Sequence, residues 1–288
     1  MCRKLIKYDL RAVRSLWLIQ ALILLALAIP FSLGLRFVTS EHSDAVAVYE
    51  GLVSLFLFLC IVWFFVSAVL VSVLVYVHYY KNLFTDEGYL TFTLPVTRRQ
   101  ILLSKLATAL ILQGAQIVVY LVVAAVVLLL APTPESGNLI TLAGYKALGE
   151  FLGILWNELG AWLILYVVQG LLILVCYALF TTLTAYFCIT IGSTVVRKGK
   201  LPLAIGIYYG IQSVLSFVLQ INIFSAFTPF GVFSVTSVIM GLAQRLDAQN
   251  VYVGMAILLT IILMAILALA IILFCMTLDM LERKLNLA

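Results

Sequence analysis

Long apolar stretches separated by short polar segments dominate the pattern along the 288 residues of this chain. Six of the stretches reach the length of about 20 residues that a helix needs to cross a bilayer. They lie at 16–37, 52–77, 101–131, 159–192, 202–221 and 251–275. The pattern therefore predicts an all-α polytopic membrane protein, in which residues 1–288 form a single transmembrane domain with six transmembrane helices.

Two further segments are rich in apolar residues but do not fit a full span. Segment 133–157 carries Lys146 and Glu150 among leucines and glycines, which predicts a helix on the outer surface. Segment 222–246 is interrupted by Pro229 and Gly231. The apolar run after the proline has only about 14 residues, short of a span. We therefore expect a re-entrant hairpin before the last span.

The first fifteen residues predict an amphipathic helix at the membrane surface. Lys4, Lys7, Arg11 and Arg14 follow one another at helical spacing, so they share one face of a helix. Such an elbow helix would lie on the inner surface before the chain enters the bilayer. Two interpretations stay open: a simple positively charged anchor, or a helix that a partner subunit also touches.

Composition and charge give the topology. The chain is 65% hydrophobic and 10% charged, whereas soluble domains are about half apolar and a quarter charged. With both termini in the cytoplasm, 14 of the 17 lysines and arginines lie on the inner side. Arg36, Lys146 and Arg245 are the three outside. The net charge of +5 thus reflects the positive-inside rule and does not predict a nucleic-acid partner.

Candidate chemistry is sparse. The sequence contains no HExxH, GxSxG or P-loop motif, and its two histidines, His42 and His78, fall at or beyond the ends of predicted spans. We expect no enzymatic activity, no metal and no cofactor. Ionisable residues are almost absent from the predicted spans, and the polar residues there are mainly neutral, notably Gln113 and Gln116 on one face of the third span and Gln169 in the fourth. These glutamines either line a pathway or form hydrogen bonds between packed helices.

The most distinctive segment is the polar loop at 82–100, between the second and third spans. It is predicted to face the cytoplasm, and its exposed apolar side chains exceed what a connector needs. We expect it to bind a soluble partner. The predicted contact residues are Asp86, Glu87, Gly88, Tyr89, Phe92, Pro95, Arg98 and Arg99.

Local signals within this loop differ. The acids after Thr85 favour a helix start, whereas the alternation of apolar residues and threonines over 90–94 favours an extended piece. Both alternatives stay open. Thr97 and Gln100 form a capping box that starts the next helix. Lys105 lies deeper, and we expect its ammonium group to extend back to water.

The run NLFTDEGYLTFTLPVTRR, Asn82–Arg99, resembles permease subunits of ABC-2 type transporters, especially a group from Gram-positive anaerobic bacteria. The ending Lys284–Leu287 and the basic opening are also similar to that group. The resemblance implies six spans, a basic elbow helix, a cytoplasmic coupling element after the second span and a re-entrant hairpin before the sixth. It also implies a dimer driven by a separate ATP-binding subunit, which would bind the ATP. Many relatives carry large extracellular domains that this chain lacks, which leaves the substrate open.

The expected function is that of a permease subunit of an ATP-driven ABC-type exporter in a bacterial plasma membrane. The translocation path would form between two copies, or between this chain and a sister permease. The alternative is a non-transporting polytopic membrane protein, such as a sensor, an assembly factor or an immunity factor. It would recruit a soluble partner through the same loop.

Overall fold

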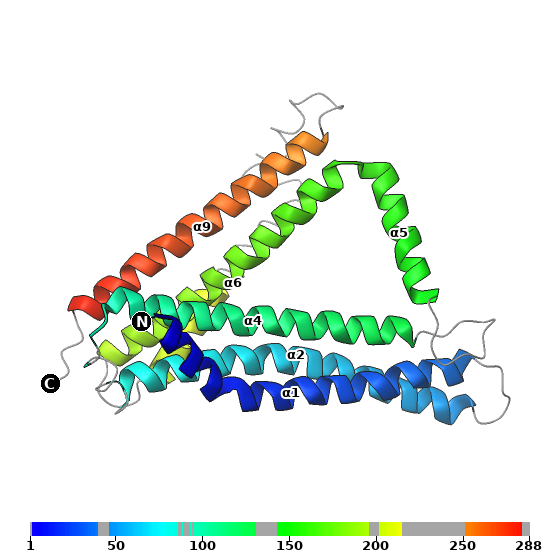
Figure 1. Ribbon diagram of the computed structural model, residues 1–288, viewed down its shortest axis with the longest axis horizontal. Helices are drawn as coiled ribbons and strands as arrows, with labels where there is room; N and C mark the ends of the chain where they lie inside the picture. Colours follow the sequence, from blue (N-terminus) through cyan, green and yellow to red (C-terminus); the bar gives the residue numbers. More distant parts are fainter. Residues whose placement is uncertain are drawn as a thin grey trace. The chain divides into compact units, whose positions relative to one another are not determined.

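The computed structural model describes residues 2–39, 46–85, 88, 93, 95–130, 143–195, 202–214 and 251–283 (Figure 1). Within these ranges all regular structure is helical, which confirms the predicted all-α class. The helices are α1 (Cys2–Thr39), α2 (Val46–Phe84), α4 (Arg98–Leu129), α5 (Ala143–Leu159), α6 (Trp162–Val195) and α9 (Val251–Arg283). One further helix covers 202–214.

Five helices in the described ranges are long and apolar enough to cross a membrane. Their candidate spans are Arg3–Ser32, Ser54–Phe84, Arg98–Leu129, Trp162–Thr194 and Tyr252–Glu282. They correspond to five of the six predicted spans. The span predicted at 202–221 begins as the helix 202–214, and its remainder lies outside the described residues, as does the predicted hairpin at 222–246.

Several helices extend beyond the predicted spans. The predicted surface helix over 1–15 and the first span form one continuous helix, α1. Helix α2 continues to Phe84, so that His78 lies inside it rather than beyond its end. The reason is that hydropathy marks the part of a helix that suits lipid, whereas the helix ends only where its backbone hydrogen bonds end.

Helix α5 overlaps the segment 133–157 that was predicted to be a surface helix and extends past it to Leu159. It ends at a glycine, Gly160, whose φ of 55° lies in the left-handed region. The Gly160 amide donates to the carbonyl of Trp156 at 2.8 Å. A glycine just past a helix C-terminus adopts this conformation without a Cβ clash, which allows α6 to begin two residues later, at Trp162.

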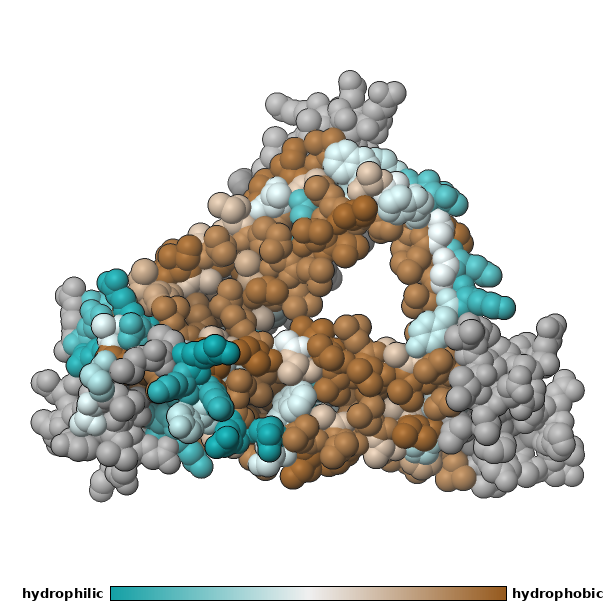
Figure 2. All heavy atoms as spheres, viewed as in Figure 1, coloured by the Kyte–Doolittle hydropathy of each residue, from teal (hydrophilic) through white to brown (hydrophobic). Residues whose placement is uncertain are grey.

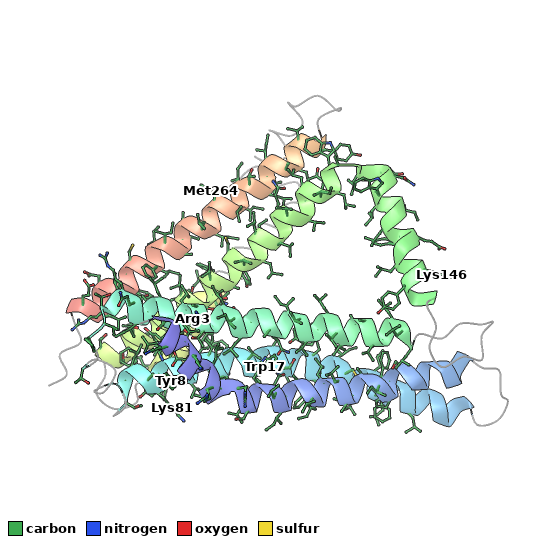
Figure 3. The ribbon with its side chains drawn as sticks, in the orientation of Figure 1. Arg3, Tyr8, Trp17, Lys81, Lys146 and Met264 are labelled. Atoms are coloured by element: carbon green, nitrogen blue, oxygen red, sulfur yellow. The ribbon has the colours of Figure 1, made fainter. Side chains whose placement is uncertain are left out.

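Large apolar side chains point outward along the candidate spans. Phe58 is 61% exposed, Phe65 64% and Met264 63%. Hydrophobic atoms cover most of the helical surface in Figure 2, and Figure 3 labels Met264 on α9. A surface of this kind is stable in lipid rather than in water. The chain is therefore a multi-pass membrane protein.

The chain divides into two compact units. The first comprises Met1–Tyr79 and Leu103–Gly160, and the second comprises Tyr80–Leu102 and Ala161–Ala288. In the second unit α6 packs along α9. The Tyr166 hydroxyl donates to the carbonyl of Tyr252 at 2.8 Å. An apolar cavity of about 440 Å³ lies among α6, α9 and the helix 202–214.

In the first unit, two polar layers join α1, α2 and α4, and each layer takes one side chain from each helix. The charged layer consists of Asp9, His78 and Lys105. The amide layer consists of Gln20, Ser67 and Gln116. The side chains buried between the layers include Val13, Val71, Val75, Ala109 and Leu112.

The two layers are in register on all three helices. Positions 9 and 20, 67 and 78, and 105 and 116 are each eleven residues apart. Eleven residues are close to three turns of about 3.6 residues, so each pair lies on one helix face about 16 Å apart. The numbering rises together in α1 and α4 and falls in α2, which makes α1 and α4 parallel and α2 antiparallel to both.

Candidate functional site

The polar loop at 82–100, here called the contact loop, leaves α2 through a tight turn. The Thr85 hydroxyl donates to the carbonyl of Lys81, and the Gly88 amide donates to the carbonyl of Thr85 at 2.8 Å. Gly88 is buried. A Cβ at this position would lie 2.5 Å from the Leu83 carbonyl oxygen, a backbone atom that no side-chain rotation can move. The absence of a Cβ at Gly88 therefore allows the chain to pass this close to the backbone of α2.

The other predicted contact residues are placed in part. Gly88 and Thr93 are helical, and the rest of 86–94 lies outside the described residues. Pro95 is exposed. Asp86, Glu87, Tyr89 and Phe92 lie outside the described residues.

The predicted capping box at the start of α4 is confirmed. The Thr97 amide donates to Oε1 of Gln100 at 3.4 Å, and the Gln100 amide donates to the Thr97 hydroxyl at 3.4 Å. The Thr97 carbonyl accepts the first helical bond, from Ile101, at 3.2 Å. This reciprocal arrangement satisfies amides that a helix start leaves without partners, and it fixes where the loop becomes α4.

The two adjacent arginines differ in their surroundings. The half-buried Arg98 donates from Nη1 to the carbonyl of Leu281 and, at 2.6 Å, to that of Glu282. These carbonyls belong to the last turn of α9, where a cation also meets the negative end of the helix dipole. Arg99 is exposed. Of the pair, Arg99 presents its guanidinium outward, whereas Arg98 joins the start of α4 to the end of α9.

We expect Arg98→Ala to loosen the last turn of α9, because two terminal carbonyls lose a charged donor. The expected cost is about 1 kcal/mol, at the lower end for charge-assisted hydrogen bonds because the site is partly exposed. Hydrogen–deuterium exchange over 279–283 measures it. Arg99→Ala is the matched control and should leave this exchange unchanged. Equal exchange in both variants would contradict the role given to Arg98.

The charged layer centres on one carboxylate oxygen. Nζ of Lys105 donates to Oδ1 of Asp9 at 2.6 Å, and Nε2 of His78 lies 3.0 Å from the same oxygen. The Lys105 side chain is 5% exposed, that of Asp9 8% and that of His78 16%. All three residues lie within candidate membrane spans. Ionisable groups at such positions are costly unless they pair with one another, and these three do.

The charged layer corrects one expectation and adds one residue. Lys105 was expected to extend back to water, but its ammonium group is buried against Asp9. Asp9 was not identified from the sequence as a structural residue. The available signal was its position: it lies on the opposite face of α1 from Lys7, Arg11 and Arg14. An acid facing away from a basic stripe indicates a buried basic partner.

The amide layer links the same three helices by hydrogen bonds between neutral side chains. Nε2 of Gln20 donates to Oε1 of Gln116 at 2.7 Å, and Nε2 of Gln116 donates to the Ser67 hydroxyl at 3.5 Å. The Tyr120 and Ser67 hydroxyls are 2.9 Å apart, and the Trp63 indole donates to the carbonyl of Gln20 at 3.2 Å. Buried bonds of this kind hold helices together where lipid removes the hydrophobic driving force.

The three candidate pathway glutamines are thus placed as follows. Gln116 bonds within the amide layer, and Gln169 is buried and donates to the carbonyl of Ala256 on α9 at 3.2 Å. Gln113 is half-buried on α4. Gln116 and Gln169 each bond a neighbouring helix of their own unit, as expected of packing residues.

Over the ranges that the structure describes, no group of three or more His, Cys, Asp or Glu side chains gathers as a metal site would require. Comparisons with protein-family models, with curated proteins and with solved structures each found no match. The chain stands as a multi-pass helical membrane protein with five candidate spans in its described part.

Proposed function

We propose that this chain is the membrane-spanning permease subunit of an ATP-driven ABC-type exporter. A separate ATP-binding subunit would hydrolyse the ATP and act on the permease through the loop at 82–100. The chain itself would catalyse no reaction. Two permease subunits would form a dimer, with the translocation path between them.

The observation that carries the proposal is the loop itself. Its sequence, Asn82–Arg99, resembles the corresponding loop of ABC-2 type permeases. Its described parts are bonded at both ends to helices long enough to span a membrane: through Thr85 and Gly88 to α2, and through the capping box to α4. Arg98 adds a bond to α9. Because the loop is bonded to α2, α4 and α9, a force applied to it would move these helices.

Other features belong to the same proposal. Both termini would be cytoplasmic, as the excess of basic residues on one side indicates, and the membrane would be a bacterial plasma membrane. The opening of α1 would act as the elbow helix, and 222–246 as the re-entrant hairpin. The exposed Arg99 and Pro95 would take part in the subunit contact, together with the acids at 86 and 87.

Reversing the charge of the loop tests the coupling. We expect Asp86→Lys combined with Glu87→Lys to uncouple ATP hydrolysis from transport while the helices stay folded, because the change affects a contact surface and not a buried layer. ATP hydrolysis and transport are measured together in reconstituted vesicles, with helicity as the folding check. The exposed Glu150 on α5 offers the matched control, Glu150→Lys. Normal coupling in the double variant would count strongly against the proposal.

Co-purification separates the proposal from its alternative. If the neighbouring gene encodes a Walker-motif ATPase that co-purifies with this chain, the transporter proposal is supported. If a different soluble protein binds the loop and no ATPase does, the chain is a non-transporting sensor, assembly factor or immunity factor.

A further inference from the structure

The first turns of α1 carry five cations on one side, here called the basic face. It consists of Arg3, Lys4, Lys7, Arg11 and Arg14, all exposed. At 100° per residue they fall within an arc of about 100°. Figure 2 shows hydrophilic atoms gathered over these turns, and Figure 3 labels Arg3 and Tyr8 there.

The basic face has no counter-charge among the residues that the structure describes. None of its five side chains forms an ion pair or hydrogen bond with another described residue. The only acid of α1, Asp9, is buried on the other side of the helix and is bonded to Lys105. The negative charge of Asp9 therefore pairs with Lys105 and does not neutralise the basic face. Five like charges along about 16 Å of helix repel one another and attract an anionic surface.

The charged layer also fixes where the basic face points. Asp9 is bonded to His78 of α2 and Lys105 of α4, and Val13 on the same side is buried, so the opposite side of α1 is held outward. The same helix continues without a break into an apolar segment, and the candidate span Arg3–Ser32 begins at the basic face itself. Tyr8, 65% exposed, adds an amphipathic ring of the kind found at bilayer interfaces. From this continuity we infer that the cations lie at the depth of lipid headgroups.

We propose that the basic face binds anionic phospholipid headgroups in the leaflet adjoining the first turns of α1. A membrane surface fits better than an acidic protein, because the face is the end of a span and thus meets headgroups whether or not a partner is present. Fixed orientation favours the site further, since the helix loses little freedom when it binds. The proposal does not depend on the proposed transport function.

The test uses the purified full-length chain alone, in nanodiscs of equal parts phosphatidylglycerol and phosphatidylcholine. Native mass spectrometry counts the lipids that stay bound. We expect about a tenfold preference for phosphatidylglycerol at about 0.15 M salt, falling toward unity at about 1 M. Lys7→Gln combined with Arg11→Gln should lower the preference severalfold. Lys7→Arg combined with Arg11→Lys should keep it.

The exposed Lys146 on α5 provides the matched control, Lys146→Gln, which should leave the preference unchanged. Equal retention of the two lipids by the wild-type chain would overturn the proposal. So would a glutamine double variant with unchanged preference, which would leave the basic face to a protein partner.

Discussion

Replacing Lys105 by methionine is expected to destabilise the first unit more than any other single change considered. The substitution keeps the volume and the apolar stem but removes the ammonium group that lies 2.6 Å from Asp9. The buried Asp9 carboxylate then keeps its contact with His78 but loses its ammonium partner. Breaking a buried pair in this way costs on the order of 3 kcal/mol. An equilibrium unfolding titration in mixed micelles measures the free energy.

A matched control and a compensating double variant test whether the loss comes from the buried charge. The exposed Lys146 is chemically the same residue without a buried partner, so Lys146→Met should change the free energy by less than about 0.5 kcal/mol. Adding Asp9→Asn to Lys105→Met removes the buried charge and should recover most of the loss, because a neutral amide costs less to bury than a carboxylate. If Lys105→Met and Lys146→Met behaved alike, the charged layer would not stabilise the unit.

The second large effect is expected at the contact loop. In Gly88→Ala the new methyl group would lie 2.5 Å from the carbonyl oxygen and 2.9 Å from the carbonyl carbon of Leu83. Because both are backbone atoms, the chain after α2 must shift. The expected cost is about 1 to 3 kcal/mol, the range for overpacking a filled site. The loop would also move relative to α2, so coupling to a partner should fall sharply.

Gly114 on α4 is the matched glycine. No described atom lies within 4 Å of a Cβ built there, and alanine in a helix interior is favoured over glycine by about 0.5 to 1 kcal/mol. Gly114→Ala should therefore stabilise the protein or leave it unchanged, whereas Gly88→Ala destabilises it. The comparison uses unfolding free energies together with limited proteolysis of the loop. Changes of the same sign and size at both positions would contradict the close approach at Gly88.

Local signals predicted the start of α4 well and the ends of other helices poorly. The capping box of Thr97 and Gln100 depends on two side chains three positions apart, and both partners are visible in the sequence. The end of α2 carries no comparable marker. The predicted span stops at residue 77, yet the helix continues to Phe84, because a polar helix end in water needs no apolar residues.

The candidate site was predictable as a segment but not in its internal roles. Arg98 and Arg99 look equivalent in sequence. Only the position of α9 separates them, since Arg98 bonds a carbonyl 184 residues away. Gly88 was predicted only as a contact residue, but glycine is required there because the backbone of Leu83 lies so close.

By itself the sequence determined that the chain is helical and lives in lipid, since apolar runs of span length and uneven basic residues are local, one-dimensional signals. It also determined where the polar loop ends, at the capping box that starts α4. Only the tertiary structure decided which helix faces meet. Asp9 and Lys105 lie 96 residues apart, as do Gln20 and Gln116. Hydropathy reports how much of a helix is apolar but does not report which helix lies beside it. The two polar layers therefore follow only from the packing of α1, α2 and α4 in register.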